Sequence, residues 1–150
     1  MNDKYLYRAK RKNWGELPKE VWWVEGYYAF VDNHHYIYTG NLCNGWLCVV
    51  AERFEIDITT LCACTGLKDK NGKLIWENDI VKKEFYTDYD AFTNSEEYIG
   101  VVKYEDCAWS VSYERDGHKC NSPIFMAMEY QDAEHFNVIG NIFYNPELLE

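Results

Sequence analysis

The residues best suited to metal chemistry are the six cysteines and four histidines of the chain. Two cysteine pairs stand close in the sequence: four residues separate Cys43 from Cys48, and one residue separates Cys62 from Cys64. Structural zinc sites favour pairs with about two to four intervening residues, usually one pair on each of two knuckles. One pair fits that spacing loosely and the other does not. These four cysteines are therefore weak metal candidates; buried free thiols are the favoured interpretation, and no cofactor is expected.

Groups that could carry catalysis do not form a recognisable pattern. No nucleophile elbow or similar signature surrounds any Cys, His or Asp, and no glycine-rich loop is present that could cradle a phosphate. The neighbouring carboxylates Asp88 and Asp90 lie in a stretch too polar to bury them as a catalytic pair. The sequence therefore predicts a protein that is not an enzyme.

Acidic residues form the second candidate site. The chain has 15 basic and 25 acidic residues, a formal net charge of −10. From residue 129 onward there is no Lys or Arg, and the acidic residues are Glu129, Asp132, Glu134, Glu147 and Glu150. Solubility is one interpretation of this bias. The other is an acidic face that docks a basic partner or imitates nucleic acid, with Asp132, Glu134 and Glu147 as possible partner-binding residues.

The first twelve residues carry the opposite charge. Their cations stand against the single acid Asp3 and are Lys4, Arg8, Lys10, Arg11 and Lys12. Because the chain as a whole repels a phosphate backbone, nucleic acid is not the expected partner. The alternation of cations in this segment favours a solvated strand edge that discourages aggregation. The alternative function is a nucleic-acid-binding regulator that uses this basic strand.

The elements that position these groups are short strands. Six Trp, thirteen Tyr and seven Phe favour pleated, half-buried strands over helices. Alternation and turn residues predict strands over residues 5–11, 21–31, 35–38, 46–50, 98–104, 108–113 and 136–143, with a further apolar run opening at Ser122. Gly26 suggests a bulge or bend. A short helix of one or two turns begins at Asp57, residues 84–98 form a polar loop, and residues 146–149 form a capping turn.

Membrane and export signals are missing from the sequence. No run approaches the roughly 18 apolar residues that a membrane span needs. The first five residues lack the apolar core and cleavage site of a signal peptide. Without such signals the cysteines are expected to stay reduced, so the expected location is the cytoplasm.

Three ordered blocks carry a resemblance to a known family. The first is TGLKDKNGK at residues 65–73 followed by WENDIV at 76–81, and the second is GVVKY at 100–104. The third is VIGNI at 138–142 with NPELL at 145–149, and the segments YRAKR at 7–11 and WVEGYY at 23–28 fit the family's opening strands. Over nearly all of its length the chain resembles the YopX-like family of phage and prophage proteins.

The resemblance implies a location and a fold more than a chemistry. The family belongs to bacteriophages and to the prophages of Gram-positive bacteria, so the cytoplasm of a bacterial host is implied. It also implies an all-β fold of short antiparallel strands with a barrel-like (SH3-like) C-terminal half. It implies no activity, cofactor or partner. Two departures stand out: Asn78 replaces a usual Gly, and Ala63-Cys64 replaces a common Gln-Tyr, which leaves any role of that polar pair in doubt.

The family-motif residues have a structural interpretation as formers of turns and caps. They are Thr65, Gly66, Leu67, Asp69, Asn71, Gly72, Asn78, Asp79, Gly140, Asn141, Asn145 and Pro146. Asn78 is expected in a left-handed conformation, and a partner-binding edge is the alternative role for the set.

The prediction as a whole is one all-β domain over residues 1–150, with possible lobes 1–64 and 65–150 that share one core. The predicted function is a phage or prophage accessory protein that binds a host or phage protein through an acidic surface.

Overall fold

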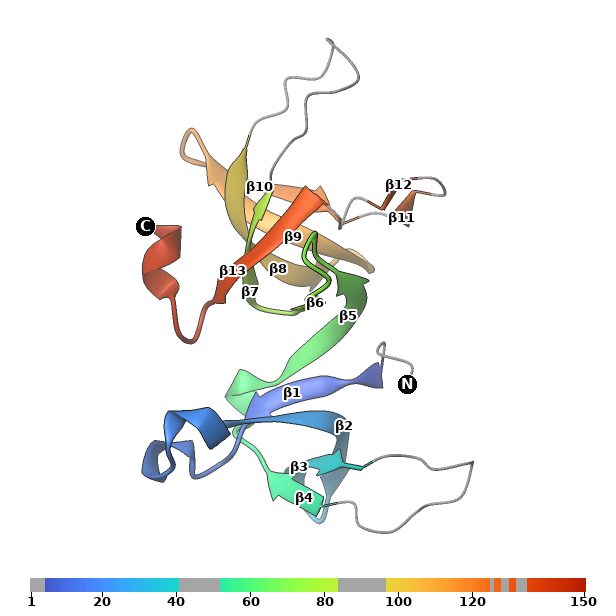
Figure 1. Cartoon of the computed structure of the whole chain (residues 1–150), viewed down its shortest axis with the longest axis vertical. Helices are drawn as coiled ribbons and strands as arrows, with labels where there is room; N and C mark the ends of the chain where they lie inside the picture. Colours follow the sequence, from blue (N-terminus) through green and yellow to red (C-terminus); the bar gives the residue numbers. More distant parts are fainter. Residues whose placement is uncertain (1–4, 41–51, 84–96, 125, 128–129, 132–134) are drawn as a thin grey trace. The chain divides into compact units, whose positions relative to one another are not determined.

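Figure 1 shows a computed structural model of the chain, which describes residues 5–40, 52–83, 97–124, 126–127, 130–131 and 135–150. The chain divides into two compact units, Met1–Cys64 and Thr65–Glu150. Both consist of antiparallel strands joined by tight turns and short 3₁₀ helices, which confirms the predicted all-β class. Within the described residues, no helix has the length and apolar character needed to cross a membrane.

The strands of the N-terminal unit follow the order β4-β3-β2-β1-β5 in a six-stranded sheet that ends with β6 (Leu74–Trp76). The strands of this unit are β1 (Tyr7–Lys10), β2 (Trp23–Val31), β3 (His34–Thr39), β4 (Glu52–Glu55) and β5 (Cys62–Lys68), the last of which continues into the C-terminal unit. One face of this sheet buries a small apolar core, which consists of Ala9, Val24, Ile37 and Ile56. Alternation along β2 and β3 places Val24 and Ile37 on the core side and leaves their neighbours on the other face.

Three short 3₁₀ helices complete this unit: η2 (Trp14–Glu16), η3 (Lys19–Val21) and η4 (Ile58–Thr60). Asp57 caps η4, because its Oδ1 accepts hydrogen bonds from the Thr59 backbone N–H at 3.1 Å and from the Thr59 hydroxyl at 2.6 Å. A side-chain oxygen just before a helix commonly accepts from its unpaired first N–H groups in this way. The predicted short helix at Asp57 is therefore confirmed.

The C-terminal unit contains a five-stranded antiparallel sheet in the order β10-β9-β8-β7-β13. Its strands are β7 (Asp79–Lys83), β8 (Tyr98–Glu105), β9 (Ala108–Arg115), β10 (His118–Pro123) and β13 (Phe136–Asn141). The smaller elements are β6 (Leu74–Trp76), the pair β11 (Met126–Ala127) and β12 (Tyr130–Gln131), and the 3₁₀ helix η6 (Pro146–Leu149). Among the described residues this order is linear, so the sheet stays open and does not close into a barrel.

The core of the C-terminal unit lies against one face of this sheet. Its buried members are Ile75, Val81, Val102, Val111, Ile124 and Phe136. Because strand residues alternate, the other face of β7, β8 and β9 carries the residues in between. Among these, Ile99 is exposed, whereas Ile80 and Ser110 are buried.

Two-residue turns join three pairs of strands that are neighbours in the sequence: β2 and β3, β8 and β9, and β9 and β10. Their central residues all have positive φ and are Asp32-Asn33, Asp106-Cys107 and Asp116-Gly117. Type I′ turns require this backbone conformation. The first two turns join the predicted hairpins. The third starts β10, a polar edge strand that the sequence did not predict, because HKCNSP lacks the apolar alternation of a half-buried strand.

One local prediction was wrong in part, and two others concern segments that lie wholly or mostly outside the described residues. Of the bulge or bend predicted at Gly26, the bulge is absent, since β2 pairs in unbroken register with β1 over residues 23–26 and with β3 over residues 27–31. The predicted strand at 46–50 and most of the predicted loop at 84–98 lie outside the described residues.

Candidate functional site

Asp69, from the first family block, organises the turn between β5 and β6. Its carboxylate accepts three backbone hydrogen bonds: Oδ1 from Asn71 N at 2.8 Å and Lys73 N at 2.9 Å, and Oδ2 from Val138 N at 3.0 Å. The residue is only 4% exposed. Burial opposes its ionisation, but the N–H groups of Val138, Lys73 and Asn71 outweigh burial, so the pKa of Asp69 lies below its ordinary value. This carboxylate ties the turn to β13.

The neighbouring motif residues also bond to backbone. Thr65 donates its hydroxyl to the Ile75 carbonyl at 2.7 Å and accepts from Leu67 N at 3.0 Å. Gly66 and Gly72 have φ values of 75° and 79°. Residues with a side chain rarely adopt that backbone conformation. Asn71 Nδ2 donates to Oδ1 of Asn137, the residue just before the third family block, at 3.0 Å. Together with the bond from Val138 N to Asp69, this contact brings the first and third family blocks together.

The turn between β6 and β7 depends on Asn78 and Asp79. Asn78 has φ 65°, the left-handed conformation that the sequence indicates, and its Oδ1 accepts from Lys103 Nζ at 2.7 Å. Asp79 is 1% exposed and accepts from Trp76 N at 2.9 Å. Asp79 thus holds the turn, and Asn78 ties it to β8.

The last family block shapes the exit from β13. A Cβ on Gly140 would lie 2.7 Å from the Asn145 Oδ1, so glycine leaves the space that Asn145 occupies. Asn141 Oδ1 accepts from the backbone N–H of Phe143 at 3.0 Å, and Pro146 begins η6. This turn fixes where η6 starts.

The metal candidates are only partly described. Cys43 and Cys48 lie outside the described residues, whereas Cys62 and Cys64 are buried in β5 in the thiol form. In the ranges that the structure describes, no three His, Cys, Asp or Glu residues gather in a way that could hold a metal ion.

Of the three acidic candidates, the structure describes one. Asp132 and Glu134 lie outside the described residues. Glu147 is exposed in η6, and its Oε1 accepts from Asn145 Nδ2 at 3.4 Å.

The basic N-terminal strand is not a solvated edge, and that prediction was wrong. β1 lies between β2 and β5, and its cations lie over aromatic rings. Lys10 is 5% exposed, with Nζ 4.1 Å from the Trp14 ring centroid and 4.8 Å from that of Trp22. Arg8 lies over Trp23 at 5.4 Å. Such contacts stabilise the cations inside the unit. Of the cations that the structure describes in this segment, only Lys12 is classed as exposed.

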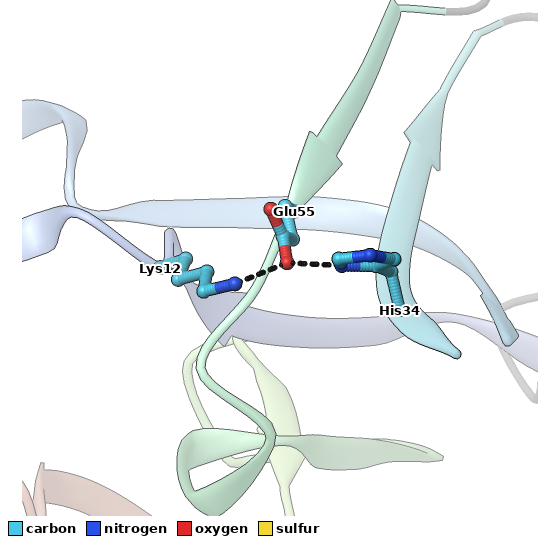
Figure 2. Close-up of polar contacts among 3 residues, drawn as sticks. All are labelled: Lys12, His34 and Glu55. Carbon is cyan, nitrogen blue, oxygen red and sulfur yellow. Dashed lines mark hydrogen bonds and ion pairs between the residues drawn. The ribbon is translucent and has the colours of Figure 1, made fainter. Parts of the chain in front are cut away.

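A polar cluster of Lys12, His34 and Glu55 lies on the surface of the N-terminal unit (Figure 2). Glu55 Oε1 is 2.5 Å from Lys12 Nζ and 2.8 Å from His34 Nδ1. Because an ionised carboxylate only accepts hydrogen bonds, both nitrogens donate to it. The hydrogen bond from Lys12, followed by that from His34, holds the pKa of Glu55 below its ordinary value. A carboxylate so stabilised is a weak general base.

This cluster makes a direct prediction for titration. Lys12→Met is expected to raise the pKa of Glu55 toward its ordinary value, and to raise it more than His34→Asn does, because Lys12 makes the larger contribution. Carbon-detected NMR of the Glu55 carboxyl as a function of pH measures this directly. Lys119→Met, in the other unit, serves as the control and should leave the curve in place. An unchanged curve in Lys12→Met would contradict the ion pair.

An open groove of about 690 Å³ lies on the C-terminal unit, where η6 meets the surface side of β8. Its apolar lining includes Ile99, Leu148 and Leu149, which are 40%, 36% and 45% exposed. Tyr98 and Tyr113 also line it, with rings stacked 3.9 Å apart and 12° from parallel. Sequence reasoning missed this site because it arises from strand register and from the position of η6, which no local pattern reports.

Fold and groove together define a small all-β protein of two antiparallel units with an open apolar groove on the C-terminal one. The chain belongs to the YopX family, since the model of that family, described as YopX protein, matches residues 6–150. No curated protein matches the chain at a significant level. Protein EF1440 from Enterococcus faecalis, of known crystal structure, is similar at 23% identity over 96% of both chains, with a TM-score of 0.42.

Proposed function

We propose that this chain is an accessory protein of a phage or prophage. It acts in the bacterial cytoplasm, without catalysing a reaction, by binding a host or phage protein. The groove of the C-terminal unit is the binding surface, and the exposure of Ile99, Leu148 and Leu149 beside one another is the observation that carries the proposal. Contiguous apolar side chains on a surface commonly mark a site of protein association, because burying them releases water.

Charge supports binding of a protein over binding of nucleic acid. The net charge of −10 attracts a basic partner over a distance and repels phosphate. The nucleic-acid alternative depends on the basic N-terminal strand, whose cations Arg8, Lys10 and Arg11 lie against Trp and Phe rings and offer few contacts to a phosphate backbone. Glu147 on η6 stands next to the groove residues Leu148 and Leu149, so acidic and apolar groups adjoin there.

Removing the apolar wall formed by η6 should abolish partner binding. In a tagged pull-down from a bacterial host, with and without phage induction, we expect wild type to enrich a protein that Leu148→Ser/Leu149→Ser loses. The expected loss is at least about tenfold, the effect of roughly 1.4 kcal/mol of binding free energy. Mass spectrometry identifies and quantifies the captured protein.

A matched control keeps this test specific. Phe30→Ser/Val31→Ser removes two exposed apolar side chains from the N-terminal unit, where they are 56% and 36% exposed. This control should capture the partner as wild type does, whereas Glu147→Lys should weaken capture. Equal capture by the groove variant and by the control, or capture of nothing by wild type, would refute the proposal.

A further inference from the structure

We infer that the groove receives a short segment of the partner protein in which a large apolar side chain stands next to a Lys or Arg. This inference rests on the proposed function and adds the chemistry of the segment that is bound. Two observations support it. Apolar side chains share one face of the sheet, and only some of the charged groups around them have ion-pair partners.

The register of the strands brings the groove residues into cross-strand contact. Ile99 of β8 pairs with Lys82 of β7, and Val101 of β8 pairs with Ser112 of β9. Residues directly opposite one another in an antiparallel pair have Cβ atoms roughly 5 Å apart. Ile99 and Val101 therefore form an apolar strip along β8 on the face opposite the core, and Leu148 and Leu149 add a second apolar wall.

Some of the charged side chains around this strip have ion-pair partners and others do not. Lys82 forms an ion pair with Glu97 at 3.2 Å, and Lys119 forms one with Glu105 at 3.8 Å. The carboxylates of Glu114 and Glu150, which also line the groove, form no ion pair within the described part of the chain. The charge left for a ligand is therefore negative, and it attracts a cation.

Apolar and acidic groups in this arrangement match a Lys or Arg beside a large apolar residue. The long aliphatic stem of either cation covers apolar surface while its charged end stays with carboxylate and water. The neighbouring apolar side chain packs against Ile99 and the leucines of η6 and buries them. A free metal ion or a small polar ligand would leave these side chains exposed. Ligand sites commonly enclose several hundred cubic ångströms. The groove, at about 690 Å³, is large enough for two such side chains.

Labelled peptides test this preference with the full chain. The probe is a fluorescein-labelled hexapeptide with arginine between two leucines, compared by fluorescence anisotropy with twins that carry glutamate for arginine or alanine for both leucines. We expect the arginine peptide to bind about fivefold more tightly than its glutamate twin, the effect of one exposed ion pair. Glu114→Gln/Glu150→Gln should abolish that preference, and Leu148→Ser/Leu149→Ser should weaken binding of both leucine peptides.

Asp106→Asn/Asp116→Asn is the matched control. It removes the same net charge from two hairpin turns outside the groove, at positive φ values that Asn tolerates. This variant should keep the preference for arginine. Equal affinity for the arginine and glutamate peptides, or a preference that survives Glu114→Gln/Glu150→Gln, overturns the inference.

The inference and the proposed function can fail separately. A pull-down in which the groove variant loses the partner, together with peptides that show no charge preference, leaves the proposed function standing and overturns the inference. Sedimentation supplies another outcome. A wild-type dimer that Leu148→Ser/Leu149→Ser converts to a monomer would show that a second copy fills the groove, which also overturns the inference.

Discussion

Replacing Asp69 by Asn is expected to lower the free energy of unfolding of the C-terminal unit by about 3 kcal/mol. The carboxylate is buried and accepts from three backbone N–H groups, those of Asn71, Lys73 and Val138. An Asn side chain offers one oxygen, so its NH₂ group would face an N–H donor and leave a buried hydrogen bond unmade. Native-state hydrogen exchange of the amides of Val81 and Val102 reports this unit separately.

The control for this substitution is Asp116→Asn. Asp116 lies in an exposed turn with φ 51°. A surface change of this kind should alter stability by less than about 0.5 kcal/mol. Exchange protection in Asp69→Asn that equals the protection in Asp116→Asn would show that the three hydrogen bonds contribute no net stability.

Acid should reduce the difference between wild type and Asp69→Asn. The pKa of Asp69 is lower in the folded protein than the ordinary carboxyl value. Its contribution is therefore fully present above that ordinary value, about 3.9. The contribution falls as pH drops below it and through the lower pKa of the folded state. Exchange measured at neutral pH and at a pH below the ordinary carboxyl pKa of about 3.9 reveals this trend, and a gap that widens in acid would contradict it.

Gly26→Ala is expected to destabilise the N-terminal unit by about 3 kcal/mol. A Cβ on Gly26 would lie 2.1 Å from the Tyr38 carbonyl oxygen and 2.9 Å from its carbonyl carbon. Both atoms belong to the backbone of β3, so relief requires that β2 and β3 move apart and lose paired hydrogen bonds. Hydrogen exchange of the Ile37 amide, together with circular dichroism on heating, measures the loss.

Gly15→Ala is the matched control, because no atom from another part of the fold lies within 4 Å of the position where its Cβ would be. It should leave the stability of the N-terminal unit close to that of wild type. If Gly26→Ala behaved in the same way, the close approach of β2 to Tyr38 could not be a feature of the folded unit.

Local chemistry predicted those elements whose determinants are close in sequence. Asp57 and the threonines after it indicated a capped turn, and the alternation of residues 98–113 indicated β8 and β9. These predictions succeeded because capping and hairpin pairing depend on neighbours within a few residues. β10 was missed because its side chains are polar, although Asp116-Gly117 is a strong hairpin signal that could have revealed it.

Features that depend on distant residues could not be predicted in the same way. The cations of β1 were interpreted as solvated because alternation alone does not show what covers a strand face; Trp14 and Trp22 come from a later segment. The groove depends on η6 lying near β8, which comes much earlier in the chain, and on register that local patterns leave open. The motif residues were recognised as turn formers, but the contact of Asp69 with Val138 was not foreseen.

That contact has a consequence for how the protein is made. A ribosome releases Asp69 well before Val138, which lies 69 residues further on, and β13 follows the other described strands in the sequence. The edge of β7 and the turn that Asp69 organises therefore lack this partner until β13 has been translated. A premature stop codon before residue 136 would remove β13, which pairs with the edge of β7 and supplies the Val138 N–H to Asp69. Messages truncated there would yield chains with an exposed β7 edge, which are substrates for aggregation and proteolysis.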